Sequence, residues 1–180
     1  MNHALGKLTL CWAAAILPGS ALAADPLVAE LEQRLANAGV ESVNDYLSAH
    51  PDAAMARFNR QAASCELQAV SLALRLARGV NARAVLAHEE SLRAATGRCA
   101  RFILALASAA EIPRVCASQA AWGAAQTARE LRRRIADIDA DKLLRATAQG
   151  QACRAAYLDE LKNTRVTLRV ASPSPAAPER

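Results

Sequence analysis

The chain has 180 residues, and 22 Lys or Arg residues against 17 Asp or Glu residues give it a net charge of +5 at pH 7. Hydrophobic residues make up 53% of the chain and aromatic residues only 3%, a composition that favours helix almost throughout. The basic residues are dispersed among acidic ones, so the charge favours anionic partners only mildly.

The first predicted element is a secretory signal peptide over residues 1–23. A basic start with Lys7 precedes an apolar run over 8–17, and the small residues Ala21 and Ala23 fit a cleavage site after Ala23. The apolar run is shorter than the ~20 residues of a spanning helix. We therefore expect a periplasmic or secreted protein, with no transmembrane segment in the mature chain and no nucleic acid as a routine ligand.

Residues 24–170 are predicted to form a single helical domain that begins with two short helices. Asp25 is a suitable cap for the first helix, and Gly39 follows its expected end. The second short helix is expected to start at Ser42 and to end before Pro51.

Four long helices are predicted to follow. Apolar residues three and four positions apart mark one helix over 51–78, and the same spacing resumes after a break at 79–81 and continues until Pro113. A third helix is expected over 114–136, and a fourth after a turn at 137–141. Short connections between long helices are typical of an all-α, antiparallel up-down-up-down bundle.

The C-terminal part of the predicted domain is expected to stay helical. Val166, Leu168 and Val170 alternate like a short strand, but no partner strand is evident, so we interpret them as the fraying end of the fourth helix. The segment 171–180 contains three prolines and is predicted to be a disordered tail.

Four cysteines remain in the predicted mature chain: Cys65, Cys99, Cys116 and Cys153. An even number in an oxidising compartment indicates two disulfides, and none of the four is close enough to another for a Cys-x-x-Cys metal motif. Because each helical residue rises ~1.5 Å, Cys65 and Cys99 lie at similar heights on either side of the turn at Val80. The heights of Cys116 and Cys153 around a turn near Asp139 match less well. We favour the pairs Cys65–Cys99 and Cys116–Cys153, although pairing Cys65 with Cys153 and Cys99 with Cys116 stays open.

The sequence also leaves open an internal duplication. Gln68-Ala69 shortly follows Cys65, and Gln119-Ala120 shortly follows Cys116. The segments 92–97 and 144–150 resemble each other, and each precedes the later cysteine of a favoured pair. A true repeat would consist of two disulfide-linked helical hairpins.

Two groups of residues could suggest a metal or cofactor, but we interpret both structurally. His88 falls on an apolar seam, where a core histidine is the simpler interpretation than a haem or metal ligand. Asp137, Asp139 and Asp141 imitate the start of a calcium loop, but Lys142 stands where the turn glycine belongs. We interpret the aspartates as helix caps and expect no metal and no cofactor.

A run of arginines ends the third predicted helix, at the same end of the predicted bundle as two arginines of the first long helix. Such an end could receive an anionic partner, and a nearby tryptophan could anchor an interface. The candidate interface residues are Arg129, Arg132, Arg133, Arg75, Arg78 and Trp122. Arg134 belongs to the same run.

No catalytic constellation is visible in the sequence, so we expect a non-enzymatic protein. The leading hypothesis is a periplasmic protein that binds an unknown protein partner in the cell envelope, as an inhibitor, an immunity factor, a chaperone or an accessory of an envelope machine. The alternative is a helical bundle that binds a small ligand or a cofactor through His88 or the arginine-rich end.

Overall fold

The computed structural model describes residues 25–171, with side chains through Thr164. The predicted signal peptide over 1–23 and the predicted tail beyond Ala171 lie outside the described residues. Within the described part every regular element is a helix, which confirms the all-α fold class. No helix there is long and apolar enough to cross a membrane.

In chain order the helices of the described part are α1 (Pro26–Ala49), the single-turn π-helix η1 (Pro51–Met55), α2 (Ala56–Ala63), α3 (Leu67–Leu76), α4 (Ala82–Leu106), α5 (Ile112–Val115), α6 (Ala124–Ala140), α7 (Lys142–Ala146) and α8 (Ala148–Ala171).

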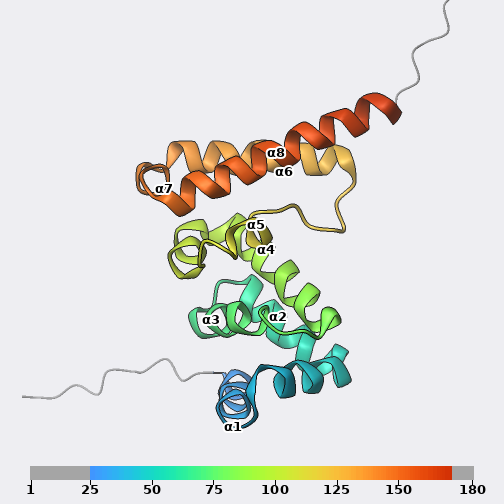
Figure 1. The fold of residues 1–180 in the computed structure, drawn as a ribbon, viewed down its shortest axis with the longest axis vertical. Coiled ribbons are helices and arrows are strands. Elements are labelled where there is room, and N and C mark those ends of the chain that lie inside the picture. Colours follow the sequence, from blue (N-terminus) through green and yellow to red (C-terminus); the bar gives the residue numbers. More distant parts are fainter. Residues whose placement is uncertain (1–24, 172–180) are drawn as a thin grey trace, which may run out of the picture.

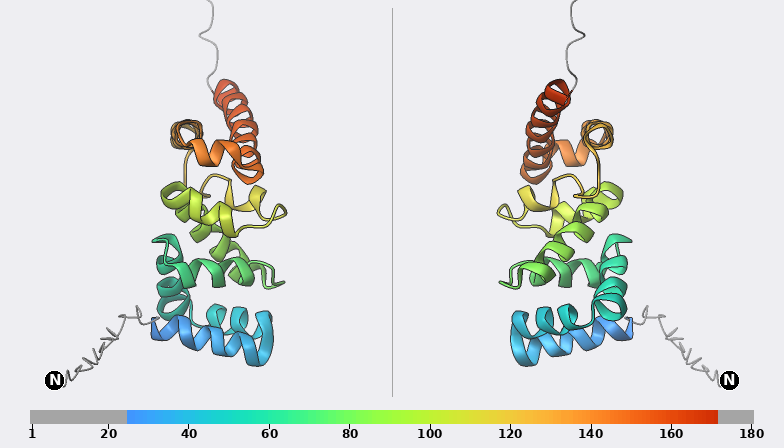
Figure 2. Two further views of the ribbon diagram at one scale, coloured as in Figure 1. Left: turned by 90° about the vertical axis from the view of Figure 1, so that its left-hand side faces the viewer. Right: turned by 90° about the vertical axis from the view of Figure 1, so that its right-hand side faces the viewer.

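The helices form successive layers along the long axis of the molecule (Figure 1). Helix α1 lies at one end, α2 and α3 form the next layer, α4 and α5 follow, and α6 and α8 pack along each other at the opposite end. The two side views show the same order (Figure 2). The helices therefore form an elongated stack, in which each layer contacts its neighbours.

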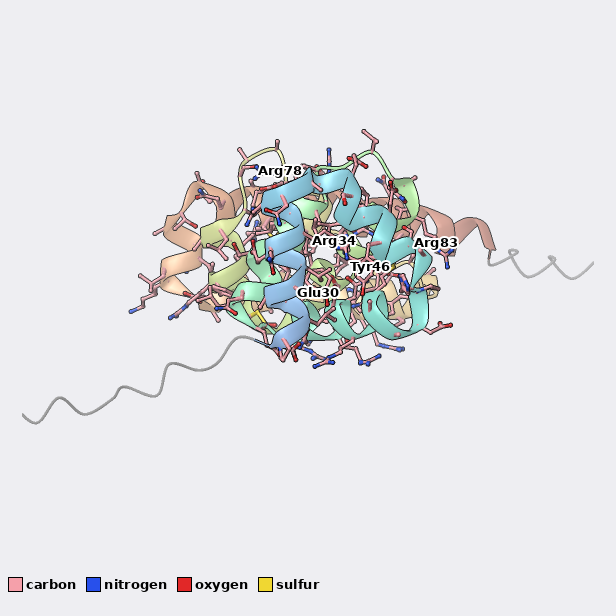
Figure 3. The ribbon with its side chains drawn as sticks, turned by 90° about the horizontal axis from the view of Figure 1, so that it is seen from below. Glu30, Arg34, Tyr46, Arg78 and Arg83 are labelled. Atoms are coloured by element: carbon pink, nitrogen blue, oxygen red, sulfur yellow. A yellow bond between two sulfur atoms is a disulfide. The ribbon has the colours of Figure 1, made fainter. Side chains whose placement is uncertain are left out.

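Helix α1 starts where the sequence predicts and spans both of the predicted short helices. The Asp25 side chain accepts a hydrogen bond from the Leu27 backbone N–H at 2.8 Å, which caps the first turn. Gly39 has a φ of 79°, a left-handed conformation that glycine adopts without steric cost, and it divides α1 into two parts. The bend lets the Arg34 guanidinium stack on the Tyr46 ring, 4.2 Å from its centroid (Figure 3).

The continuous helix predicted over 51–78 is wrong, because three helices occupy that segment. Helix α2 ends at Ala63, Cys65 adopts a left-handed φ of 71°, and α3 begins at Leu67. Both α2 and α3 pack on α4, and apolar side chains of both helices are buried. The three-and-four spacing of apolar residues therefore continues from α2 into α3, and it gives no sign of the break between the two helices.

The third predicted helix is also divided. Helix α5 ends at Val115, the segment 117–123 contains no helix, and α6 begins only at Ala124. At its other end α6 continues through the predicted turn to Ala140. Asp141 then caps α7 by accepting hydrogen bonds from the backbone N–H groups of the second and third residues of α7. Of the three aspartates interpreted as caps, only Asp141 is seen to serve as one.

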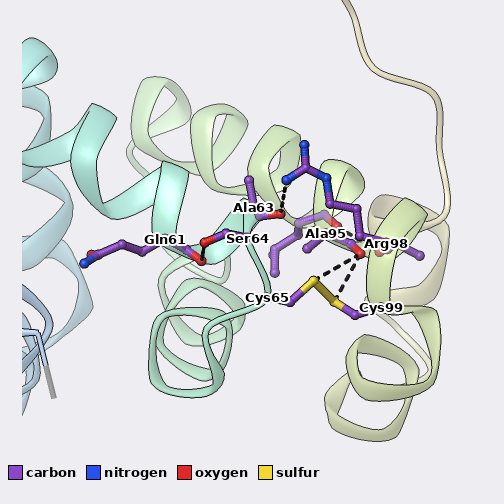
Figure 4. Close-up of a disulfide and its surroundings, with 9 residues drawn as sticks. Gln61, Ala63, Ser64, Cys65, Ala95, Arg98 and Cys99 are labelled. Atoms are coloured by element: carbon purple, nitrogen blue, oxygen red, sulfur yellow. Dashed lines mark hydrogen bonds between the residues drawn. A yellow bond between two sulfur atoms is a disulfide. The ribbon is translucent and has the colours of Figure 1, made fainter. Parts of the chain in front are cut away.

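The two favoured disulfides are confirmed. Cys65 and Cys99 are joined with their Cα atoms 6.4 Å apart, and Cys116 and Cys153 with theirs 5.3 Å apart. Figure 4 shows the first bond, between the short turn before α3 and the bend in α4. The first bond joins the turn before α3 to α4, and the second joins the segment before α6 to α8. Because α3 packs on α4 and α6 packs on α8, the two disulfides occupy similar places in two successive helix pairs.

Candidate functional site

His88 lies in the core, with an exposed fraction of 0%. Its Nδ1 lies 3.0 Å from the Asn59 amide oxygen, and its Nε2 lies 3.2 Å from the Asn44 amide oxygen. Burial lowers the pKa of His88 to about 4, so the ring is neutral at pH 7 and carries a single N–H. Asn44 donates its amide N–H to the Leu76 carbonyl at 3.1 Å, which leaves its amide oxygen to accept from Nε2.

These hydrogen bonds connect three helices around one buried ring. Asn44 comes from α1, Asn59 from α2 and His88 from α4. With both ring nitrogens occupied by side-chain amides, His88 is a structural core residue. In the described part of the chain, no cluster of three His, Cys, Asp or Glu residues could hold a metal ion.

The three aspartates near the end of α6 point into separate ion pairs. Asp137 accepts from Arg133 at 3.0 Å, Asp139 accepts from Arg154 at 2.6 Å, and Asp141 accepts from Arg101. Hydrogen bonds from the paired arginines hold the pKa values of Asp139 and Asp141 below their usual range. Asp139 therefore links α6 to α8 and Asp141 links the start of α7 to α4, whereas Asp137 pairs within α6, and the three do not converge on a common centre.

The structure does not bring the six candidate interface residues together. Arg75 pairs with Glu32 at 2.8 Å, and Arg78 pairs with the buried Glu111 at 2.8 Å. These two arginines belong to the layer of α3, whereas the others lie on or beside α6, and α4 and α5 stand between the two layers (Figure 1). The predicted basic end is thus divided between two levels of the stack.

The outer face of α6 carries the remaining candidate arginines. Arg129, Arg132 and Arg133 are all exposed. Arg133 pairs with Glu130 at 2.9 Å and Asp137 at 3.0 Å within its own helix. No carboxylate among the described residues lies within ion-pair distance of Arg129 or Arg132, so their charges face solvent.

Arg134, next in the run, is buried with an exposed fraction of 4%. Its guanidinium carbon lies 5.1 Å from the centre of the half-buried Trp122 ring and 5.7 Å from that of the Tyr157 ring. One terminal nitrogen, Nη1, donates to the Tyr157 hydroxyl at 3.1 Å, and the buried Nε has no hydrogen-bond partner. No described carboxylate pairs with this buried cation.

A cavity of about 370 Å³ lies between α4 and the layer of α6 and α8, and Arg134 is part of its wall. Its lining residues are Thr96, Gly97, Arg98, Cys99, Ala100, Arg101, Phe102, Arg134, Asp137, Ile138, Asp141, Leu144 and Tyr157. The sequence predicts Arg134 as part of the arginine run at the basic end of the bundle, and that prediction misses this site. The spacing of Thr127, Leu131, Arg134 and Ile138 carried the signal, because it places an arginine on the buried face of α6.

Comparisons with family models, curated proteins and solved structures found no match to this chain. The interpretation of the site therefore depends on its geometry. Of the features described above, the exposed face of α6 and the cavity beside Arg134 are the two that could receive a partner or a ligand.

Proposed function

We propose that this chain is an exported, non-enzymatic periplasmic protein that binds another protein through the outer face of α6. The two disulfides support export, because such bonds persist mainly in oxidising compartments. The predicted signal peptide supports the same compartment.

The observation that carries this proposal is the pair of exposed arginines, Arg129 and Arg132, for which the described part of the chain offers no carboxylate partner. Arginine and tryptophan are enriched in protein interfaces, and half-buried Trp122 lies just before the start of α6. Unpaired positive charge on an exposed helix complements an acidic protein surface and accelerates association with it. The partner is therefore expected to present acidic side chains.

Site-specific photo-crosslinking in the native envelope tests this interface. A photo-reactive amino acid is placed at Ala136, which is exposed on the outer face of α6, and in a second protein at Ala53, which is exposed in η1. We expect one discrete crosslinked protein from position 136 and none from position 53. The same product from both positions, or none from position 136, would contradict the proposal.

Charge reversal supplies the matched comparison. The double variant Arg129→Glu/Arg132→Glu should lose the crosslinked product, because it presents negative charge to an acidic partner. Arg60→Glu/Arg83→Glu changes the net charge equally on exposed residues of α2 and α4, and it should retain the product. Equal loss in both variants would assign the effect to net charge and not to α6.

Small-ligand binding is the second candidate function, and only the arginine-rich form of it has structural support. Both nitrogens of His88 are engaged by asparagine amides, whereas Arg134 presents a buried, unpaired charge to a cavity. That cavity is separate from the proposed protein interface on the outer face of α6.

A further inference from the structure

Arg134 is a buried charge with no carboxylate partner among the residues that the structure describes. A guanidinium cannot be deprotonated in a protein, so it keeps its charge at an exposed fraction of 4%. Removing a charge from water costs several kcal/mol unless an opposite charge or hydrogen bonds compensate. The Tyr157 hydroxyl and two aromatic rings compensate in part, but Nε has no acceptor.

The guanidinium forms part of the cavity wall. Gly97 lines the cavity, and a Cβ atom added there would lie 2.7 Å from Nη2 of Arg134. Tyr157, which accepts from Nη1, lines the same cavity. The residues beside both terminal nitrogens thus border the cavity, and Gly97 is the residue whose lack of a side chain lets the guanidinium approach α4 closely.

The other charges around the cavity are already engaged. Asp141 accepts from Arg101, and Asp137 accepts from Arg133 at 3.0 Å. Arg98 is exposed and donates to the Ala63 carbonyl at 3.4 Å (Figure 4). Neither aspartate therefore neutralises Arg134, and the cavity retains an unbalanced positive charge.

We propose that this cavity binds a small organic carboxylate, which accepts hydrogen bonds from the terminal nitrogens of Arg134. Arginine presents parallel N–H groups that match a carboxylate. The apolar side chains of Phe102, Ile138 and Leu144 line the same space and would cover an apolar body attached to the carboxylate. A volume of about 370 Å³ lies near the lower end of ligand-binding pockets, which suits a body of about one ring.

Isothermal titration of the full chain with sodium benzoate tests the site. Benzamide has the same ring without the charge, and inorganic phosphate has charge without an apolar body. We expect saturable binding of benzoate at least tenfold tighter than binding of either comparison molecule. Equal binding of benzamide would overturn the role of Arg134, and preferential binding of phosphate would overturn the organic class.

Two variants assign the binding to this cavity. Arg134→Met removes the charge and keeps a similar apolar stem, and it should weaken benzoate binding at least tenfold. Arg132→Met makes the same change on the exposed face of α6 and should leave binding within twofold of the unaltered chain. Unchanged binding by the Arg134 variant would overturn the proposal.

A third variant keeps the proposal testable if Arg134→Met fails to fold. Ala100→Leu adds volume from the cavity wall and retains Arg134. It should keep the helical circular dichroism and lose benzoate binding by at least tenfold. A folded Ala100→Leu protein that binds benzoate as tightly as the unaltered chain would place the benzoate elsewhere. The result is independent of the crosslinking from α6, so each proposal can fail alone.

Discussion

Removal of the Cys65–Cys99 disulfide should lower the free energy of unfolding by about 4 kcal/mol. The two cysteines are 34 residues apart, and in the loop-closure model a crosslink of that length removes entropy from the unfolded chain worth about 4 kcal/mol at 25 °C. The Cys116–Cys153 bond spans 37 residues and should contribute nearly the same amount, because the entropy depends on the logarithm of loop length.

Burial distinguishes the two bonds. Cys116 and Cys153 have exposed fractions of 1% and 0%, whereas Cys65 and Cys99 are only half-buried. Replacing a fully buried side chain by a smaller one leaves space that the surroundings fill incompletely, which costs about 1 kcal/mol for a small group. The variant Cys116→Ala/Cys153→Ala should therefore lose about 1 kcal/mol more than Cys65→Ala/Cys99→Ala.

Urea unfolding followed by helical circular dichroism measures both variants against the unaltered chain. Each variant replaces both partners, so no unpaired thiol remains from the broken bond. A loss below about 1 kcal/mol in either variant would refute the loop-closure reasoning for that bond. A greater loss from the half-buried pair would refute the assignment of the extra cost to burial.

The glycine beside α7 and the buried histidine give two further predictions. Gly150→Ala should lower the free energy of unfolding by more than about 2 kcal/mol in thermal unfolding, because its Cβ would lie 1.9 Å from the Leu144 carbonyl oxygen. Gly123→Ala is the control: its Cβ would meet no atom within 4 Å, so the free energy of unfolding should change by less than about 0.5 kcal/mol. A similar cost at both positions would contradict the predicted contact. The folded pKa of His88 is about 4, so the unfolded chain takes up the proton first as the pH falls below about 6.5, and the free energy of unfolding should decrease by about 3 kcal/mol between pH 6.5 and 4. His88→Gln should flatten this decrease in urea titrations at pH 7, 6, 5 and 4, and an unchanged slope would show that His88 is not its cause.

The sequence predicted the features that depend on single residues with a distinctive local role. Asp25 caps the first helix, Gly39 interrupts it, and the similar heights of Cys65 and Cys99 favour one observed disulfide and thereby the other. The cap, the interruption and the disulfide pairing each depend on which residue type stands at which position, so the sequence alone was enough to predict them.

The division into layers could not be read from apolar spacing. Phe58 and Ala62 in α2 and Leu72 in α3 are all fully buried and both helices pack on α4, so their spacing is that of one uninterrupted helix. The break depends on a left-handed backbone at Cys65, a conformation that cysteine rarely adopts and that no local pattern indicates. The segment 117–123 was missed for a related reason, because its alanines are compatible with helix.

The cavity and its arginine depend on how the layers meet. Helix α4 contacts α7 and α8 only sparsely, and the Cys116–Cys153 disulfide joins the end of α5 to α8 across the same boundary. A covalent link beside a sparsely packed boundary holds two layers together without requiring side chains to fill the space between them. The stack can therefore keep both a cavity and an unpaired Arg134 at this boundary, where close packing of the layers would otherwise exclude them.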